Sequence, residues 1–337
     1  MKILFDRHIP ASLAPGGAQI QVDRTSAALA AIGVEVEPLR WWDEQQTGDL
    51  VHFFGTCNND YLGVARAARR PVVVTTLFTE TCNRSAARLS RQGLLVRALL
   101  ALPFGEGIKQ QLAWRTFHNC DQNVVGLAAE REVLRRVYRV SDGKISIVPL
   151  GLSEIFLNAG AGSRGENHLI TTGTITERKN SVALAELAHA AQVPILFVGK
   201  PYHAADPYWR RFEKLVDERW VKLHPHVETE AEMAALLRAA RGFVFMSAFE
   251  NWCLSAHEAA ACGLPLLVQD QNWSRERFGA QANYFPGFGV NDANIRALKK
   301  FYAAAPKLAA PGVKLTSWRD VAVALKQVYE KVLAARA

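Results

Sequence analysis

The sequence has few cysteines and no cysteine motif. Its five cysteines, Cys57, Cys82, Cys120, Cys253 and Cys262, are odd in number and form no C-x-x-C pair. Neither a disulfide framework nor a zinc knuckle is therefore predicted. A reducing, cytoplasmic setting is the simplest interpretation.

Long hydrophobic runs are also missing. The N-terminal stretch MKILFDRHIP is interrupted by Asp6 and Arg7, which leaves it too short for a secretory signal. The longest other candidate, LLVRALLALPF, begins at Leu94 and is broken by Arg97, well short of a membrane span. Neither a leader nor a transmembrane segment is predicted.

What remains is the composition of a globular protein. The chain has 337 residues, enough for two domains of ordinary size, and is 49% hydrophobic and 21% charged. Its formal net charge of +8 favours anionic partners: nucleotide phosphates, an acidic membrane surface or nucleic acid. Charge alone does not choose among them.

Short apolar runs alternate with helical patterns along the first half. Strands are predicted at KILFD, VEVEPL, LVHFFG, PVVVTTL, QNVVGL and KISIVPLG. Helical spacing occurs between them at 19–32, at 64–68 and in AEREVLRRVY. This alternation indicates a parallel sheet covered on both faces.

The alternation restarts after AGAGSRGEN at 159–167, a small and polar segment that we interpret as a linker or surface loop. Further strands are predicted at HLITTG, PILFVG, VKLHPHV, GFVFMS and LPLLVQD. The helices predicted between them are 181–191, a segment around 209–217, AEMAALLRAA and SAHEAAAC. The tail at 318–335 has one apolar side and predicts a helix.

We therefore predict an α/β protein with two Rossmann-like parallel-sheet domains facing a cleft. The expected domains are 1–158 and 166–316, followed by a C-terminal helix at 317–337. Ligands of such sheets bind outside the carboxyl ends of the strands, so site residues should follow strands directly. This architecture hosts several functions and does not name one.

The segment PGGAQ at 15–19 follows the first strand and opens the first helix. Paired glycines let the backbone approach a ligand, and a helix N-terminus favours an anion. The segment is not the G-x-G-x-x-G of a dinucleotide fold. A plain loop before a helix explains it equally well.

The segment TTGTITERKN at 171–180 follows the first strand of the second domain. Gly173 allows a tight exit from the strand, and Arg178 and Lys179 precede the next helix. Cations are disfavoured at a helix N-terminus, so these two favour an anionic ligand such as a diphosphate. A solvated basic pair is the alternative.

The segment 245–270 carries two glutamates. Glu250 lies in the loop after a buried strand, and Glu258 lies on a helix of small residues that begins at about Leu254. Carboxylates accept hydrogen bonds from hydroxyls and would repel phosphate. We predict that one binds the transferred sugar and the other a ribose. Two salt-bridged glutamates are the alternative.

These segments together resemble the GT-B glycosyltransferases, specifically glycosyltransferase family 4. The resemblance covers most of the chain. It rests on GGAQ near the start, VPLG at 148–151, G-x5-K at Gly173 and Lys179, E-x7-E at Glu250 and Glu258, and CGLPLLV after it. The order and the spacing of the set are specific, although E-x7-E alone is weak.

The resemblance implies a retaining glycosyltransferase that moves a sugar from a nucleoside-diphosphate sugar to an acceptor, in surface polysaccharide or glycoconjugate assembly. The first domain would be the acceptor side, and the second would bind the nucleotide-sugar. The C-terminal helix would cross back to the first domain. No cofactor and no obligatory metal are implied, since the nucleotide-sugar is a substrate.

The resemblance also implies roles for single residues. Glu258 would hold the ribose hydroxyls, and Glu250 would contact the donor sugar. Arg178 and Lys179 would bind the diphosphate, and with Glu250 they form the expected catalytic set. The remaining donor-binding residues would be Gly17, Gly173, Pro225, Asn251, Trp252, Cys253 and Leu254.

The chain departs from the family pattern after the strand PVVVTTL. Family members usually carry a histidine there, where this chain has Leu77, Phe78, Thr79 and Glu80. Thr79 or Glu80 could take its place. The main alternative is a non-catalytic GT-B-like subunit that binds a nucleotide-sugar or a partner protein, and a lesser one is a nucleotide-sugar epimerase.

A basic, leucine-rich stretch extends from residue 84 to residue 115. Its basic residues are accompanied by the single acid Glu106, and they are Arg84, Arg88, Arg91, Arg97, Lys109 and Arg115. The pattern predicts either peripheral contact with an anionic membrane or lipid-linked acceptor, on the inner face of the membrane, or an ordinary solvated helix. No recognised nucleic-acid-binding motif is present, so no nucleic-acid partner is predicted.

Three histidines lie in or next to predicted strands. His52 lies in a predicted strand and either lines the cleft or belongs to the core. His224 and His226 form an H-x-H pair without a carboxylate that could join them, so no metal site is predicted.

Overall fold

The computed structural model describes residues 1–7, 17–76, 78, 80–103, 105, 107, 109, 114–225 and 227–336. The chain divides into two compact units. Unit 1 comprises Met1–Gly151 and Trp318–Ala337, and unit 2 comprises Leu152–Ser317. The short helix α7 (Glu154–Leu157) therefore lies in unit 2, although the sequence placed residues up to 158 in the first domain.

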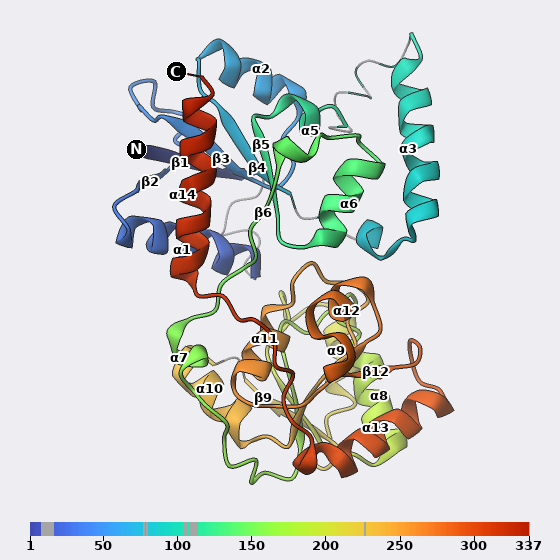
Figure 1. Cartoon of the computed structure of the whole chain (residues 1–337). Helices are drawn as coiled ribbons and strands as arrows, with labels where there is room; N and C mark the ends of the chain where they lie inside the picture. Colours follow the sequence, from blue (N-terminus) through green and yellow to red (C-terminus); the bar gives the residue numbers. More distant parts are fainter. Residues whose placement is uncertain are drawn as a thin grey trace. The chain divides into compact units, whose positions relative to one another are not determined.

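Unit 1 is a parallel sheet flanked by helices (Figure 1). Among the described residues, its six strands lie in the order β2-β1-β3-β4-β5-β6. The strands are β1 (Lys2–Arg7), β2 (Glu35–Pro38), β3 (Leu50–Phe54), β4 (Val72–Thr75), β5 (Gln122–Val125) and β6 (Ile145–Ile147). The helices are α1 (Gly17–Ala31), α2 (Asn59–Ala67), α3 (Ala86–Ala101), α5 (Thr116–Asn119), α6 (Ala128–Arg136) and α14 (Trp318–Ala334).

Unit 2 repeats this plan. Over the described residues, its six parallel strands lie in the order β12-β11-β10-β7-β8-β9. The strands are β7 (Leu169–Thr172), β8 (Ile195–Val198), β9 (Val221–His224), β10 (Gly242–Phe245), β11 (Leu266–Gln269) and β12 (Asn283–Phe285). Besides α7, the helices are α8 (Ser181–Ala191), α9 (Pro207–Glu213), α10 (Glu230–Ala239), α11 (Leu254–Ala261), α12 (Asn272–Phe278) and α13 (Asp292–Ala304).

Several inner strands of both sheets are buried along their whole length. All four residues of β4, β7, β10 and β11 are buried, and these residues are apolar apart from the threonines of β4 and β7 and the glutamine of β11. Helices must cover both faces of such a sheet. The predicted fold class, two Rossmann-like parallel-sheet domains, is confirmed in each unit.

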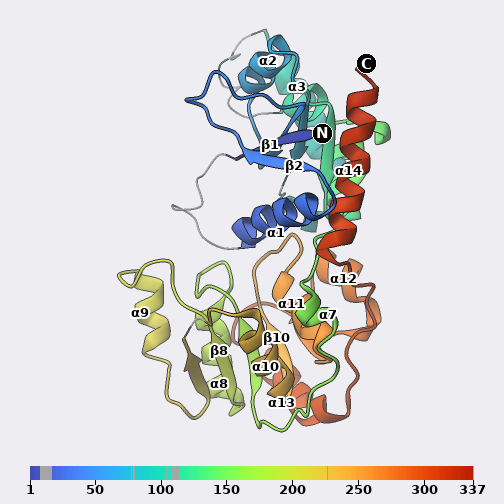
Figure 2. The same ribbon diagram turned by 90° about the vertical axis from the view of Figure 1, so that its left-hand side faces the viewer.

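The C-terminal helix α14 belongs to unit 1, where it packs against α1 (Figure 2). Its Tyr329 hydroxyl lies 2.6 Å from Nδ1 of His52, and the other ring nitrogen lies 2.6 Å from the Thr75 hydroxyl. His52 is fully buried, so it is the core histidine of the two alternatives. Burial lowers its pKa to about 3 and keeps the ring neutral.

The polar segment at 159–167 is part of unit 2 and packs against the rest of it. The Arg164 guanidinium donates to the carbonyl of Leu308 at 2.7 Å and also to that of Gly263. A Cβ on Gly162 would come within 2.1 Å of the Arg238 carbonyl oxygen, so only glycine fits there. The segment is thus a tightly held surface loop.

Several elements were not anticipated from the sequence. Helix α2 begins at Asn59, five residues before the predicted 64–68, because the Asn58 side chain caps it by accepting from the Tyr61 amide. The region 271–316, for which the sequence predicts no element, contains α12, β12 and α13. The Asn291 side chain caps α13 in the same way, by accepting from the Asn294 amide.

Candidate active site

The candidate site lies between β7 and β10 of unit 2. From β7 the chain adds β8 and β9 on one side of the sheet, and then β10, β11 and β12 on the other. Strand β7 pairs with β8 on one side and with β10 on the other, with Leu169 opposite Gly242. The loops after β7 and β10 therefore leave neighbouring strand ends at the sheet's topological switch point. Open parallel sheets bind ligands in this position.

Side chains from these two loops form one charged cluster. Arg178 Nη1 donates to Glu250 Oε1 at 2.6 Å, and Lys179 Nζ lies 3.1 Å from the same oxygen. The Ser247 hydroxyl donates to that oxygen at 2.8 Å. The Glu250 side chain is only 10% exposed, whereas that of Arg178 is 37% exposed. The structure thus pairs residues that the sequence had assigned to different parts of the ligand.

Backbone contacts fix the two loops against each other. The Ala248 amide donates to the Arg178 carbonyl at 2.7 Å, and the Asn180 side chain donates to the Met246 carbonyl at 3.0 Å. Asn180 adopts a left-handed conformation, with φ of 53°, one residue before α8. The turn therefore holds Arg178 and Lys179 in place before a ligand arrives.

Two glycines allow this close packing. Gly173 has φ of 137°, a conformation that L-residues rarely adopt, and Lys179 Nζ lies 3.6 Å from where its Cβ would be. A Cβ on Gly199, which follows β8, would come within 2.1 Å of the Gly173 carbonyl oxygen. Gly173 was predicted from the sequence, whereas Gly199 was missed because its constraint comes from the neighbouring strand.

The charge of Glu250 is held by its partners. Burial by itself raises the pKa of this carboxyl, but the positive charges of Lys179 and Arg178 and the Ser247 hydrogen bond outweigh it and lower the pKa below its usual 4.5. Glu250 is therefore an anion at neutral pH. It can accept hydrogen bonds but does not supply a proton.

The residues predicted as backbone donors, Asn251 to Leu254, form the entry to α11. Cys253 adopts a left-handed conformation with φ of 59°, and α11 starts at Leu254. The unsatisfied amides of a helix N-terminus favour an anion. They lie directly after the loop that carries Glu250, so anion-binding amides and the charged cluster belong to one segment.

Trp252 packs rather than projecting into solvent. It is 5% exposed and stacks on His257 with ring centroids 4.6 Å apart, while the Arg277 guanidinium lies 4.1 Å from the centre of its ring. Arg277 Nε donates to His257 Nε2 at 3.1 Å, and the other ring nitrogen donates to the Cys253 carbonyl at 3.0 Å. Burial lowers the pKa of His257 to about 3, so the ring is neutral.

Glu258 is the fifth residue of α11 and is half-buried. Among the described residues, no hydrogen bond or ion pair to its carboxyl is found. Burial is the main cause that raises its pKa to about 7, and the nearby negative charge of Glu230 adds to it, against a smaller opposing effect of Lys179. Because they have no partner among the described residues, its carboxyl oxygens are available as acceptors, and a pKa of about 7 leaves the group partly ionised at neutral pH.

The other predicted site residues lie on elements that do not carry the charged cluster. Gly17 is the first residue of α1 in unit 1, and Pro225 is exposed directly after β9. Residues 15 and 16 of PGGAQ lie outside the described residues, as do Leu77, Thr79, Glu106 and His226. Within the described ranges, no group of three or more His, Cys, Asp or Glu side chains is arranged to hold a metal ion.

Three residues next to the site were not predicted from the sequence: Ser247, His257 and Arg277. Ser247 lies two residues after the buried strand β10, which was a usable signal. Arg277 could not be found in this way, because it lies 20 residues from His257 and is brought to it only by the fold of α12 against α11.

Comparisons with known proteins agree with this geometry. Residues 166–300, most of unit 2, match the family model described as Glycosyl transferases group 1. Residues of the chain are 26% identical over 111 positions to the O-antigen chain mannosyltransferase B of Escherichia coli. That match covers 31% of this chain and only 29% of the relative.

Solved structures match the whole chain. Sucrose-phosphate synthase from Thermosynechococcus elongatus superposes with a TM-score of 0.68 at 18% identity, covering 99% of this chain and all (100%) of that one. A glycosyltransferase from Rickettsia africae gives 0.65 at 11% identity, covering 98% of each chain. Anabaena HepE, solved with UDP and glucose, gives 0.61 at 14% identity, covering 98% of this chain and 99% of that one.

The class of protein follows from these matches. The fold is the GT-B fold, and unit 2 matches a glycosyltransferase family over the strands and loops that build the charged cluster. The resemblance to the GT-B glycosyltransferases that the sequence predicted is confirmed at this level. None of the described helices is long and apolar enough to span a membrane.

Proposed function

We propose that the chain is a glycosyltransferase that uses a nucleoside-diphosphate sugar as donor. The observation that carries this proposal is the cluster of Arg178, Lys179 and Glu250 at the switch point of unit 2, followed at once by the N-terminus of α11. Two cations and one carboxylate leave one positive charge for the diphosphate. Glu258, further along the same helix, supplies acceptors for hydroxyls.

The division of roles follows from charge and position. A diphosphate would take hydrogen bonds from Arg178, Lys179 and the first amides of α11, and these would stabilise the negative charge that grows on the leaving group. Glu250 would accept hydrogen bonds from hydroxyls of the transferred sugar, and Glu258 from the ribose. Gly173, Pro225 and residues 251–254 complete the part of the proposed donor site that unit 2 supplies.

The stereochemistry, the metal requirement and the pathway are proposed from similarity to other proteins. We propose retention of anomeric configuration, no obligatory metal, and a role in surface polysaccharide or glycoconjugate assembly. The family resemblance supports the first two points, and the partial similarity to an O-antigen mannosyltransferase supports the third. HepE, crystallised with UDP and glucose, supports the nucleotide-sugar class of donor.

The donor site is tested by calorimetry with a panel of nucleoside diphosphates and their sugars. Glu258→Gln should weaken nucleotide binding about tenfold or more, because a carboxylate that accepts hydroxyl hydrogen bonds contributes about 1.5–3 kcal/mol. Glu186→Gln is the matched control, since Glu186 is an exposed glutamate on α8. Glu250→Gln should chiefly lower the rate of sugar transfer.

The outcomes separate the candidate functions. Full binding in Glu258→Gln and full turnover in Glu250→Gln would contradict the assignment of the site. Nucleotide binding by the wild type without hydrolysis or transfer, over a broad acceptor panel, would instead indicate a non-catalytic binding subunit.

The acceptor side is a separate part of the proposal. We propose a sugar or lipid-linked acceptor, cytoplasmic location and peripheral contact of unit 1 with an anionic membrane, with no nucleic-acid partner. The support is the basic stretch of α3, on which Leu94 and Leu95 are each 60% exposed to solvent.

A further inference from the structure

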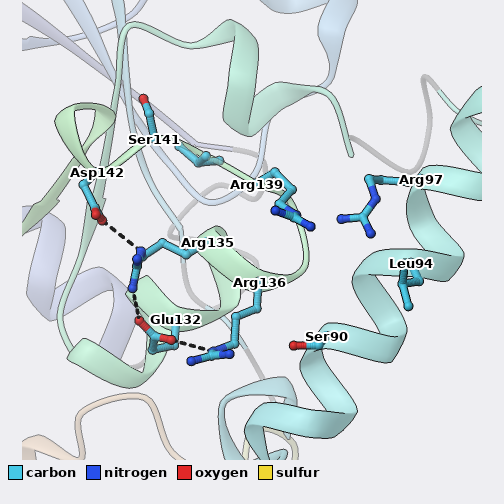
Figure 3. Close-up of a pocket in the computed structure, with 10 residues that line it drawn as sticks. Ser90, Leu94, Arg97, Glu132, Arg135, Arg136, Arg139, Ser141 and Asp142 are labelled. Atoms are coloured by element: carbon cyan, nitrogen blue, oxygen red, sulfur yellow. Dashed lines mark hydrogen bonds and ion pairs between the residues drawn. The ribbon is translucent and has the colours of Figure 1, made fainter.

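Unit 1 contains a basic pocket between α3 and the end of α6 (Figure 3). Its volume is about 570 Å³. Ser90, Leu94 and Arg97 enter it from one side of α3, at positions separated by four and three residues. Residues of α6 and of the turn after it form the opposite wall, and they include Arg135, Arg136, Arg139 and Asp142.

The pocket carries uncompensated positive charge. Both of its carboxylates are engaged: Glu132 binds Arg135 at 2.7 Å and Arg136 at 2.6 Å, and Asp142 also binds Arg135 at 3.1 Å. Arg97 and Arg139 form no side-chain hydrogen bond or ion pair within the described part of the chain. Four arginines against two carboxylates therefore leave two positive charges.

The two unpaired guanidinium groups point toward each other across the pocket (Figure 3). Like charges in this arrangement repel unless an anion lies between them. Planar guanidinium groups that converge from two elements suit a phosphate, which can accept from both. Arg139 is held in a left-handed conformation, with φ of 58°, which sets the direction of its side chain.

The walls of the pocket are packed together tightly. A Cβ on Gly93 of α3 would come within 2.2 Å of the Arg136 carbonyl oxygen, so the two helices touch backbone to backbone beside the pocket. The pocket therefore exists before any ligand binds, and little ordering would be needed on binding.

Exposed leucines lie on α3 and at its C-terminal end, next to the pocket residue Leu94. Leu94 lines the pocket and is 60% exposed, as is Leu95, and Leu99 and Leu102 are 37% and 38% exposed. An apolar strip next to a phosphate-sized basic pocket has the chemistry of the membrane interface, where headgroup phosphates lie above acyl chains. A soluble phosphate would give the leucines no partner.

We propose that this pocket binds the headgroup phosphate of an anionic lipid, with Arg97 and Arg139 as its main ligands and the exposed leucines of α3 entering the acyl region. The proposal deepens the membrane contact suggested above by naming its binding site. It does not depend on the transferase activity, which is assayed separately with soluble donor.

The test is flotation of the full chain with vesicles of phosphatidylcholine, with and without phosphatidylglycerol. Arg97→Gln/Arg139→Gln should lower affinity for the anionic vesicles roughly 30-fold, as expected for two basic residues at a charged surface. Arg69→Gln/Arg319→Gln is the matched control. Arg69 is exposed and has a left-handed backbone with φ of 55°, as Arg139 does, and Arg319 is an exposed helical residue of α14, as Arg97 is of α3. The control therefore removes two arginines of unit 1 with the same backbone conformations.

Both double variants lower the formal net charge of +8 by two, so diffuse attraction to the vesicles falls equally in both. Equal losses in the two variants would overturn the proposal, and so would failure of the wild type to bind anionic vesicles. Leu94→Ser/Leu95→Ser should weaken vesicle binding but leave binding of glycerol 1-phosphate unchanged. Wild type that binds glycerol 1-phosphate but no vesicles would show a soluble phosphate ligand and reject the lipid.

Discussion

Glu258 offers a test that separates its cost to folding from its use in binding. Its pKa is raised from 4.5 to about 7, chiefly by burial. The folded chain therefore holds this proton more tightly than the unfolded chain does. Well below pH 4.5 the carboxyl is protonated in both states and does not lower the free energy of unfolding. As pH rises from 4.5 to about 7 the unfolded state loses the proton first, so stability falls.

The size of the effect follows from the pKa difference. Each pH unit between the folded and unfolded pKa corresponds to about 1.36 kcal/mol, so the carboxylate destabilises unit 2 by up to about 3 kcal/mol above pH 7. Glu258→Gln keeps the shape of the side chain and removes the charge. We expect the variant to be more stable than wild type by about 3 kcal/mol at pH 8 and by less than about 1 kcal/mol at pH 5.

The assay is thermal unfolding of both proteins without nucleotide between pH 5 and pH 8. For a unit of this size the gain at pH 8 corresponds to roughly 6–12 °C. Glu186→Gln controls for the loss of a negative charge at an exposed site. A stability difference between wild type and Glu258→Gln that does not grow with pH would refute the reasoning, because an unstrained surface glutamate would behave in that way.

Two further substitutions test the packing of unit 1. Tyr329→Phe leaves Nδ1 of the buried His52 without its partner and should lower the free energy of unfolding by about 1–3 kcal/mol, measured by urea titration. The control Tyr202→Phe, at an exposed tyrosine, should leave the free energy of unfolding unchanged. Equal effects of the two substitutions would argue against the His52 contact. Gly93→Ala should destabilise unit 1 by about 1–3 kcal/mol because its Cβ would meet the Arg136 carbonyl, whereas Gly63→Ala in α2 has open space and should stabilise by about 0.5–1 kcal/mol. Hydrogen exchange in α3 and α6 reports the Gly93 variant, and exchange in α2 reports the Gly63 variant. A neutral Gly93→Ala would contradict the close contact between α3 and α6.

The sequence predicted the architecture well because the signals for it are local. Strands that are buried on both faces consist mainly of apolar and β-branched residues, and helices between them show periodic spacing, so β7, β10 and α11 could each be placed from their own residues. In the region 271–316, the 13-residue helix α13 was long enough to be predicted and was missed, whereas β12 has only three residues and α12 only seven. Elements this short carry too little periodicity to detect.

The candidate site was predictable as a set of residues but not as a set of contacts. Glu250, Arg178 and Lys179 were each found from their place after a strand. Their mutual pairing depends on β7 and β10 being neighbours, and the sequence order of the strands does not reveal that. The stack of Trp252, His257 and Arg277 depends in the same way on α12 lying against α11.

The pairing within the cluster changes what a ligand must supply. Glu250 is a nearly buried anion whose oxygen is held by Arg178, Lys179 and Ser247. A diphosphate that draws both cations away would leave this carboxylate undercompensated, and removing the partner of a buried charge is costly. Hydroxyls of the donor sugar could restore the lost hydrogen bonds. Phosphate binding and sugar recognition would then be coupled through one carboxylate, so that a complete donor fits the site better than its nucleotide part alone.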